Sequence, residues 1–184
     1  MAKKTTMILV LASLAVWSAP ALAGSISVEG KGSYFLPTEK AFKDIYGGGI
    51  SYGAEIGMGF LGRLSLWIGG DYYRGKGKLT FTGEETKIEI MPLCAGIRYA
   101  FSNSSIRPYV GIGVGYFQYK ESNPIGSINK GNLGLVAKLG LTAKIAGPLF
   151  ADLQADYTNC SAKPADIKAD LGGIRAGIGL GITF

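Results

Sequence analysis

Ten charged residues lie in stretches where apolar and polar side chains alternate, and they are the residues best suited to chemistry. Five are acidic and five are basic: Glu29, Glu55, Asp71, Asp152, Asp156, Lys31, Arg98, Lys138, Lys144 and Arg175. Because the two signs balance, we expect these side chains to neutralise one another inside one narrow interior. The pattern predicts either a packed polar core or a gate, in which an exchange of ion-pair partners opens a thin water path.

The expected hairpins suggest partners within this group. The expected neighbours are Lys144 with Asp152, Glu55 with Asp71, and Arg175 with Asp152 or Asp156. Removal of Arg175 should destabilise the protein, because its partners would be left charged and unpaired.

Catalytic and metal chemistry have little support in the sequence. The chain has no histidine, which Ser–His and Asp–His catalytic arrangements require. Its two cysteines, Cys94 and Cys160, fall toward opposite ends of their expected strands, so we expect neither a zinc site nor a disulfide. Two carboxylates could act as in glycosidases, but here cations match them. We expect no enzyme activity, no cofactor and no metal ion.

The glycine string Gly57–Gly62 matches a dinucleotide-binding pattern. That pattern must open a helix after a strand, whereas this string ends a strand at a turn. The glycines therefore indicate room for longer side chains in a narrow interior.

The elements that position the charged residues are predicted by alternation with a period of two. In the run from Leu133 to Ile145, odd positions are apolar and even positions are small or polar. Eight such runs can be placed: Ser25–Leu36, Tyr46–Phe60, Leu64–Thr82, Glu85–Phe101, Arg107–Glu121, Gly131–Ala146, Leu149–Cys160 and Ile167–Phe184. Each exceeds the roughly 9–11 residues that a tilted strand needs to cross a bilayer.

A membrane barrel differs from a soluble barrel in whether its charged residues face the interior or the surroundings. The face without charge contains Ile26, Val28, Ile50, Ile56, Met58, Leu64, Leu66, Ile68, Val110, Ile112, Val114, Leu139, Leu153 and Ala155. A soluble sandwich would place this face inside. In lipid it belongs outside, where a charge at the midplane costs about 2–4 kcal/mol. The sequence therefore predicts an all-β fold: an eight-stranded antiparallel up-and-down transmembrane β-barrel.

Turn residues and aromatic residues fit this arrangement. Short turns are expected at one end, at Gly62-Arg63, Asn103–Ser105 and Gly147-Pro148. Four loops are expected at the other end, at Pro37–Ile45, Gly83-Glu84, Ser122–Lys130 and Ser161–Asp166. Two interfacial girdles are expected, one of Tyr34, Tyr46, Tyr72, Tyr116 and Tyr157 and the other of Phe60, Tyr99, Phe101 and Phe184.

Two segments need separate treatment. The parity of apolar residues changes between Ile90 and Leu93, so we expect a bulge or a frayed strand near Pro92. In the first long connection, Thr38 could cap one or two helical turns that Gly47 ends. This helix would be a lid over the barrel or part of a surface-binding patch.

The first 23 residues have the pattern of an export signal. A positive start with Lys3 and Lys4 precedes an apolar run from Met7 to Trp17, and Ala21–Ala23 is a small-x-small cleavage pattern. A membrane anchor is the alternative, but the apolar run is too short to span a bilayer. The expected organisation is a cleaved signal peptide over 1–23 and one outer-membrane β-barrel domain over 24–184.

With the strands placed, the chain resembles the small outer-membrane β-barrel superfamily, which includes the membrane domain of outer membrane protein A, the X-type barrels and the opacity adhesins. The stretches that carry the resemblance are Arg98–Phe101, Arg107–Gly115 and Gly179–Phe184. The resemblance implies eight strands and the cell outer membrane. It also implies that the terminal aromatic Phe184 is read by the barrel-assembly machinery.

The expected function is a structural or surface-interaction role with a largely plugged polar lumen. A narrow pore or a carrier for small solutes or apolar molecules is the alternative. The expected partners are outer-membrane lipid, lipopolysaccharide and an unidentified surface ligand. The net charge of +6 falls to about +4 without Lys3 and Lys4, and basic residues are scattered, so we expect no nucleic-acid partner.

Overall fold

The computed structural model describes residues 24–78, 85–123, 126–162, 169–170 and 172–184. The expected signal peptide and the Gly83-Glu84 connection lie outside the described residues, as does most of the expected Ser161–Asp166 connection. Within the described residues, no helix is long and apolar enough to cross a membrane.

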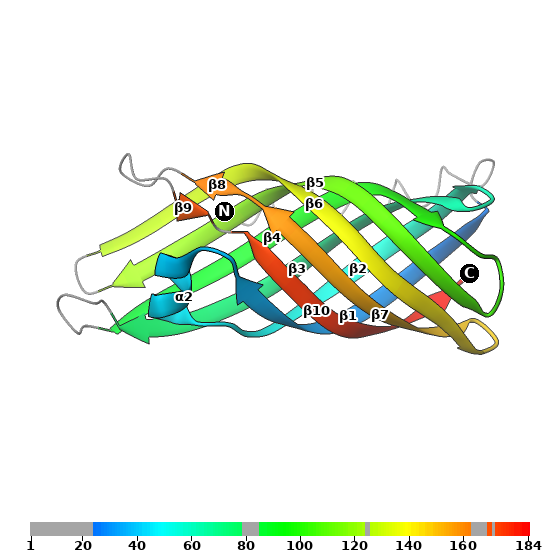
Figure 1. Cartoon of the computed structure of the whole chain (residues 1–184), viewed down its shortest axis with the longest axis horizontal. Coiled ribbons are helices and arrows are strands. Elements are labelled where there is room, and N and C mark those ends of the chain that lie inside the picture. The colour runs from blue at the N-terminus through cyan, green and yellow to red at the C-terminus, as the bar shows by residue number, and fades with distance from the viewer. Residues whose placement is uncertain (1–23, 79–84, 124–125, 163–168, 171) are drawn as a thin grey trace, which may run out of the picture.

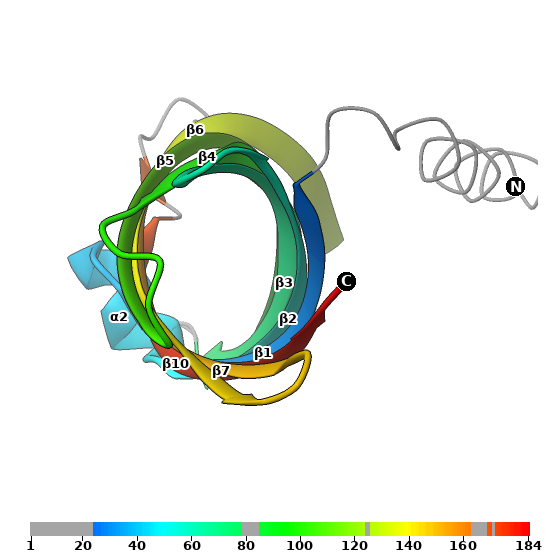
Figure 2. The ribbon, with the colours of Figure 1, turned by 90° about the vertical axis from the view of Figure 1, so that its right-hand side faces the viewer.

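Eight long antiparallel strands close into a barrel, as the alternation predicted (Figures 1 and 2). They are β1 (Ser25–Pro37), β2 (Gly49–Leu61), β3 (Leu64–Lys78), β4 (Glu85–Ala100), β5 (Ile106–Asn123), β6 (Gly126–Ala146), β7 (Leu149–Asn159) and β10 (Gly173–Thr183). Around the barrel the order is β1-β10-β7-β6-β5-β4-β3-β2. Pairing of β1 with β10, from Ser27–Thr183 to Pro37–Gly173, closes the ring and satisfies the backbone without water.

Three further elements lie at one end. The helix α2 (Lys40–Tyr46) follows β1, and the short strands β8 (Ser161–Ala162) and β9 (Ala169–Asp170) pair with each other. We call this the helix end (Figure 1). The three short turns expected from the sequence lie together at the opposite end, the turn end. Gly62 and Gly147 have positive φ angles of 54° and 52° there, which glycine adopts without steric cost.

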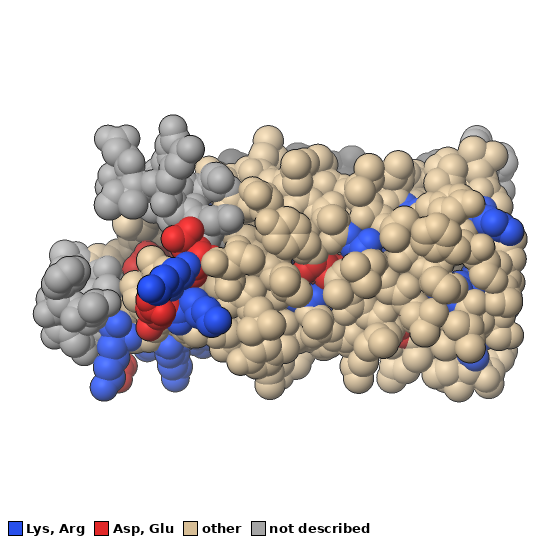
Figure 3. Space-filling view, in the orientation of Figure 1, with Lys and Arg blue, Asp and Glu red and all other residues tan. Residues whose placement is uncertain are grey.

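The expected apolar outer face is confirmed. Ile112, Leu139 and Ile178 are each more than 60% exposed, whereas Lys138 and Arg175 on the opposite face are 3% exposed. Figure 3 shows a band of uncharged residues along the barrel, with charged residues gathered beside α2. An apolar surface this continuous would be unfavourable in water and is favourable in lipid.

The expected irregularity near Pro92 is confirmed only in part: the pairing of β3 with β4 lapses at Met91 and Pro92 between Gly70–Leu93 and Tyr73–Ile90, but there is no bulge. The register of β4 with β5 is continuous from Lys87–Ser122 to Ala100–Tyr109, and even-numbered residues of β4 face inward throughout. Ile88 and Ile90 are therefore inside the barrel. The parity of apolar residues changes because the interior itself becomes apolar toward the helix end.

The connections were predicted only in part. A helix forms in the first connection and ends at Gly47 (φ 65°), but its N-cap is Glu39, with no side-chain hydrogen bond, rather than Thr38. Tyr46 belongs to this helix and not to the outer girdle. The expected loop Ser122–Lys130 is largely strand, because β5 and β6 continue to Asn123 and from Gly126 as one long hairpin.

Candidate functional site

The middle of the lumen is organised around one carboxylate, that of Glu55 on β2. Its side chain is buried and contacts three cations from three other strands: Lys31 on β1 at 3.1 Å, Lys138 on β6 at 2.5 Å, and Arg98 on β4. Three strands separate β6 from β2 in either direction around the ring, so the Lys138–Glu55 contact spans the lumen. An eight-stranded barrel is narrow enough for facing side chains to meet in this way.

Lys138 extends this cluster toward β7. Its Nζ lies 3.5 Å from Oδ2 of Asp156, donates a 3.4 Å hydrogen bond to Oε1 of Gln154, and lies 4.6 Å from the ring centroid of Trp67. The ammonium group is thus surrounded by two carboxylates, an amide and an aromatic face, which together replace water.

Asp152 forms a second polar group nearer the turn end. Its two carboxylate oxygens accept hydrogen bonds from the phenol of Tyr109 (2.7 Å) and the hydroxyl of Thr142 (3.0 Å). The Arg98 guanidinium lies 4.3 Å from the centroid of the Tyr109 ring and joins this group to Glu55.

Arg175 is placed differently from the expectation. It lies opposite Asp156 in the register of β10 with β7, as predicted, but Asp156 is paired with Lys138. The guanidinium instead stacks 4.4 Å from the Phe35 ring centroid and donates a 3.3 Å hydrogen bond to Thr158. Within the described residues, its Nε and one terminal nitrogen have no hydrogen-bond partner.

Of the other charged residues that were predicted to face the lumen, two are buried or half-buried and one is exposed. Glu29 is buried directly opposite Glu55, and Asp71 is half-buried opposite Gly53. Lys144 is exposed at the turn end, so its expected pairing with Asp152 is wrong. A register shift between Lys144 and Ala146 places Lys144 opposite Phe150, and Thr142 takes the place opposite Asp152.

Sequence reasoning placed Phe117 inside the barrel but missed the other aromatic residues there. One buried cluster, the upper cluster, fills the helix end and consists of Phe35, Phe42, Tyr73, Ile88, Ile90 and Tyr119. A second cluster consists of Trp67, Cys94, Phe117, Val136 and Cys160. Strand parity could have found Tyr73, because it has the parity of the inward Asp71 on the same strand.

The second cluster also corrects the expected placement of the cysteines. Cys94 and Cys160 belong to the same buried group rather than to opposite ends of the barrel. The two cysteines do not form a disulfide bond with each other.

Helix α2 is fastened over the upper cluster. Phe42 packs against Phe35 with ring centroids 6.3 Å apart. The Tyr46 phenol donates a 2.9 Å hydrogen bond to Glu121 and shares a 3.0 Å hydrogen bond with the Thr86 hydroxyl. Burial raises the pKa of the Tyr46 phenol, so its neutral form holds the helix in place.

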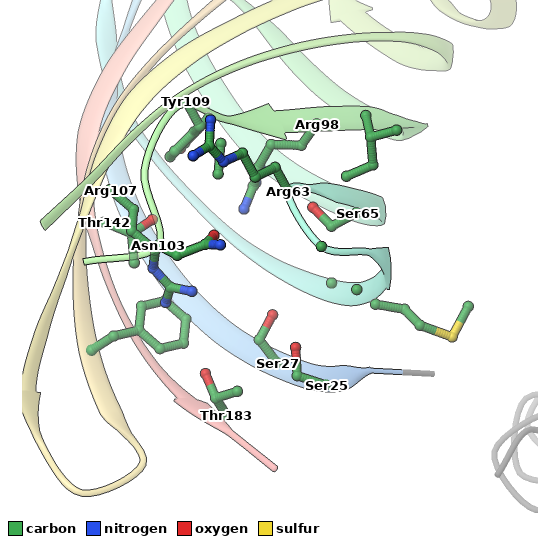
Figure 4. A pocket seen from close by; sticks show the side chains of 17 residues that line it. Ser25, Ser27, Arg63, Ser65, Arg98, Asn103, Arg107, Tyr109, Thr142 and Thr183 are labelled. Carbon is green, nitrogen blue, oxygen red and sulfur yellow. The ribbon is translucent and has the colours of Figure 1, made fainter. Parts of the chain in front are cut away.

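The described residues line two cavities along the lumen. One, of about 10 Å³, lies among Lys31, Asp71, Asp156 and Arg175 and has room for about one water molecule. The other, of about 120 Å³, opens at the turn end (Figure 4). Within the described part of the chain, no group of three or more His, Cys, Asp or Glu residues is placed to hold a metal ion.

Comparison with known proteins identifies the family. The model of the outer membrane protein β-barrel domain matches residues 9–184. The chain belongs to this family. It is therefore an outer-membrane β-barrel protein, and its apolar outer face lies in the lipid bilayer. Such barrels have short periplasmic turns and longer outer loops, so we infer that the turn end faces the periplasm and the helix end faces outward.

Solved structures show the same fold. Neisserial surface protein A is 14% identical with a TM-score of 0.63, and the match covers 88% of this chain and 98% of that one. The N-terminal barrel of Pseudomonas aeruginosa OprF is 18% identical (TM-score 0.56, covering 88% and 98%). The Yersinia pestis attachment invasion locus protein Ail is 16% identical (TM-score 0.55, covering 88% and 99%). Among curated proteins, no sequence matches this chain.

Proposed function

We propose that the protein is a non-catalytic outer-membrane barrel with a structural or surface-interaction role, whose lumen is closed to solutes. The contact of Lys138 with Glu55 across the lumen carries this proposal. A pore would need a continuous water path through this level of the barrel. Here the path meets the Glu55 cluster, then a water-sized cavity, and then the upper cluster under α2.

A narrow pore or carrier is the alternative, and it would require two separate rearrangements. The cations around Glu55 would have to exchange partners, and α2 would have to leave the upper cluster. Because a buried ion that loses its partner costs several kcal/mol, the first rearrangement needs a replacement partner close by. Two buried carboxylates are candidates for Arg98: Asp152, whose two oxygens already accept hydrogen bonds, and Glu29, which lies opposite Glu55 in the register of β1 with β2.

Lipopolysaccharide is the partner that the outer surface favours. Above the outward-facing Tyr72, the described ends of β3 to β5 carry Arg74, Lys76, Lys78, Lys87 and Lys120 on their exposed face. Lys76 and Lys87 lie directly opposite each other in the register of β3 with β4. Like charges in this position repel, so a bound anion would stabilise the pair. We assign this basic surface to lipid phosphate groups.

Biogenesis is the remaining part of the proposal. Removal of residues 1–23 would leave a mature chain that begins one residue before β1. Phe184 is 73% exposed at the end of β10, where assembly factors could contact it. We propose that the barrel-assembly machinery recognises this residue.

The proposal is tested by conductance in planar lipid bilayers. The purified barrel should give no steady current at potentials up to about 100 mV. The wild type is compared with the Glu55→Gln variant, because this substitution removes the carboxylate that three cations contact. Glu89→Gln on the outer surface is the control. Steady openings of the wild-type protein that disappear in Glu55→Gln would support the pore instead.

A further inference from the structure

The turn end of the lumen contains a cavity that is lined by many hydrogen-bond donors. Figure 4 shows its seventeen lining residues, which come from the ends of most strands of the barrel. The polar members with hydroxyl or amide groups are Ser25, Ser27, Ser65, Asn103, Tyr109, Thr142 and Thr183. The volume of about 120 Å³ is well above the roughly 10–15 Å³ that one water molecule needs.

Three arginines line the same cavity: Arg63, Arg98 and Arg107. Arg63 and Arg98 lie on one side of it in Figure 4, and Arg107 lies on the other with Asn103. The described residues that line the cavity include no aspartate or glutamate. The cavity is therefore cationic as well as rich in hydrogen-bond donors.

Among the described residues, neither Arg63 nor Arg107 forms an ion pair with a carboxylate. Asp152 accepts its hydrogen bonds from the lining residues Tyr109 and Thr142, and Glu55 contacts Lys31, Lys138 and Arg98. Within the described residues, Nε of Arg107 is buried and has no hydrogen-bond partner. Arg63 and Arg107 thus bring two positive charges to one small space without a partner carboxylate.

We propose that this cavity is a binding site for an oxyanion of the phosphate type on the periplasmic side. A guanidinium presents its N–H groups in a planar fork that matches phosphate oxygens, and two forks on opposite sides of one cavity suit a tetrahedral group. Arg63 and Arg107 supply the charge, Asn103 and the serine hydroxyls supply further hydrogen bonds, and Arg98 fixes the inner wall through Glu55. The site does not depend on whether the lumen conducts, so it goes beyond the proposed function.

The phosphate group could be free in the periplasm or belong to a lipid headgroup of the inner leaflet. Two measurements separate these sources. In nanodiscs of phosphatidylcholine, inorganic phosphate is titrated at constant ionic strength against sodium chloride, and binding is followed by calorimetry. In parallel, thermal unfolding is compared between nanodiscs with and without phosphatidic acid.

The test variant is Arg63→Gln with Arg107→Gln, and the control is Lys144→Gln, which removes an exposed cation at the same end that does not line the cavity. Circular dichroism confirms that each variant folds. For the wild type, the proposal predicts saturable phosphate binding or a rise in Tm that depends on phosphatidic acid. The double variant should weaken this response at least tenfold or abolish it, and the control should retain it. Equal responses of the wild type and the double variant in both measurements would overturn it, as would the absence of a response in both.

Discussion

Nζ of Lys138 lies 2.5 Å from Oε2 of Glu55, although the two residues belong to strands on opposite sides of the barrel. This contact spans the lumen, and the same carboxylate also contacts Lys31 and Arg98. It also explains why Glu55 should matter more for stability than any other charged residue of the lumen.

Glu55→Gln should lower the free energy of unfolding by about 3–5 kcal/mol, because it leaves buried cations without their shared partner. Denaturant unfolding in lipid vesicles measures this change. Glu89→Gln is the matched control, since Glu89 pairs with Arg74 on the exposed outer surface at 3.7 Å. That variant should stay within about 0.5 kcal/mol of the wild type. Equal effects of the two variants would contradict a central role for Glu55.

Arg175→Met should change the free energy of unfolding by less than about 1 kcal/mol, because an apolar side chain of similar length can replace a buried ion that lacks an ion pair. This revises the expectation from the sequence, in which Arg175 had acidic partners. Its observed contacts are the Phe35 ring and Thr158. A loss as large as that of Glu55→Gln would show that Arg175 is held by Asp156 after all.

Tyr46→Phe should loosen α2 without unfolding the barrel, since it removes the hydrogen bonds to Thr86 and Glu121. One such bond contributes about 1 kcal/mol, so limited trypsin cleavage after Lys40 and Lys43 should become several-fold faster. The circular dichroism spectrum of the barrel should not change. Unaltered cleavage would mean that Phe42 alone holds the helix.

The hydrogen bonds of the Tyr46 phenol should weaken at alkaline pH. Burial raises the pKa of the Tyr46 phenol, so the folded protein keeps this proton at pH values where an unfolded tyrosine, with a pKa of about 10, loses it. The stabilisation is complete below pH 10 and is lost as the pH rises beyond it. The difference in trypsin cleavage between wild type and Tyr46→Phe should therefore shrink above pH 10. A difference that grows with pH would contradict this assignment.

Lys76→Gln combined with Lys87→Gln should weaken the binding of lipopolysaccharide and leave the barrel fold intact. Titration with purified lipopolysaccharide in detergent, followed by the shift in Tm, measures the effect. Lys144→Gln at the turn end removes one exposed cation far from the outer leaflet and is the control. If the double variant and the control respond alike, the basic surface of β3 and β4 does not hold lipid phosphate.

The sequence predicted the faces of the strands better than the partners inside the barrel. Period-two alternation determines whether a residue such as Leu139 or Lys138 faces lipid or lumen, because successive side chains point to opposite sides. The partner of Lys138 could not be predicted, since Glu55 lies across the lumen and not on a neighbouring strand. Lys144 was misplaced by a register shift of one residue, which alternation alone does not reveal.

The apolar part of the lumen was missed for a related reason. Ile88 and Ile90 were interpreted as a change of parity in the strand, because the apolar residues of this strand were all expected to face outward. In the structure, Phe42 from α2 meets these inward residues in the upper cluster. That packing depends on where the connection folds back over the barrel, which no local pattern specifies.

The placement of apolar side chains in lipid and charged side chains in the lumen can be measured directly by fluorescence. In a chain that begins at Gly24, Trp67 is the single tryptophan, and its side chain is 4% exposed and faces the lumen beside Lys138. In vesicles of brominated lipid, its emission should be quenched weakly. A Leu139→Trp variant made in a Trp67→Phe background should be quenched strongly. Equal quenching of the two tryptophans, or stronger quenching of Trp67, would contradict this account of the barrel.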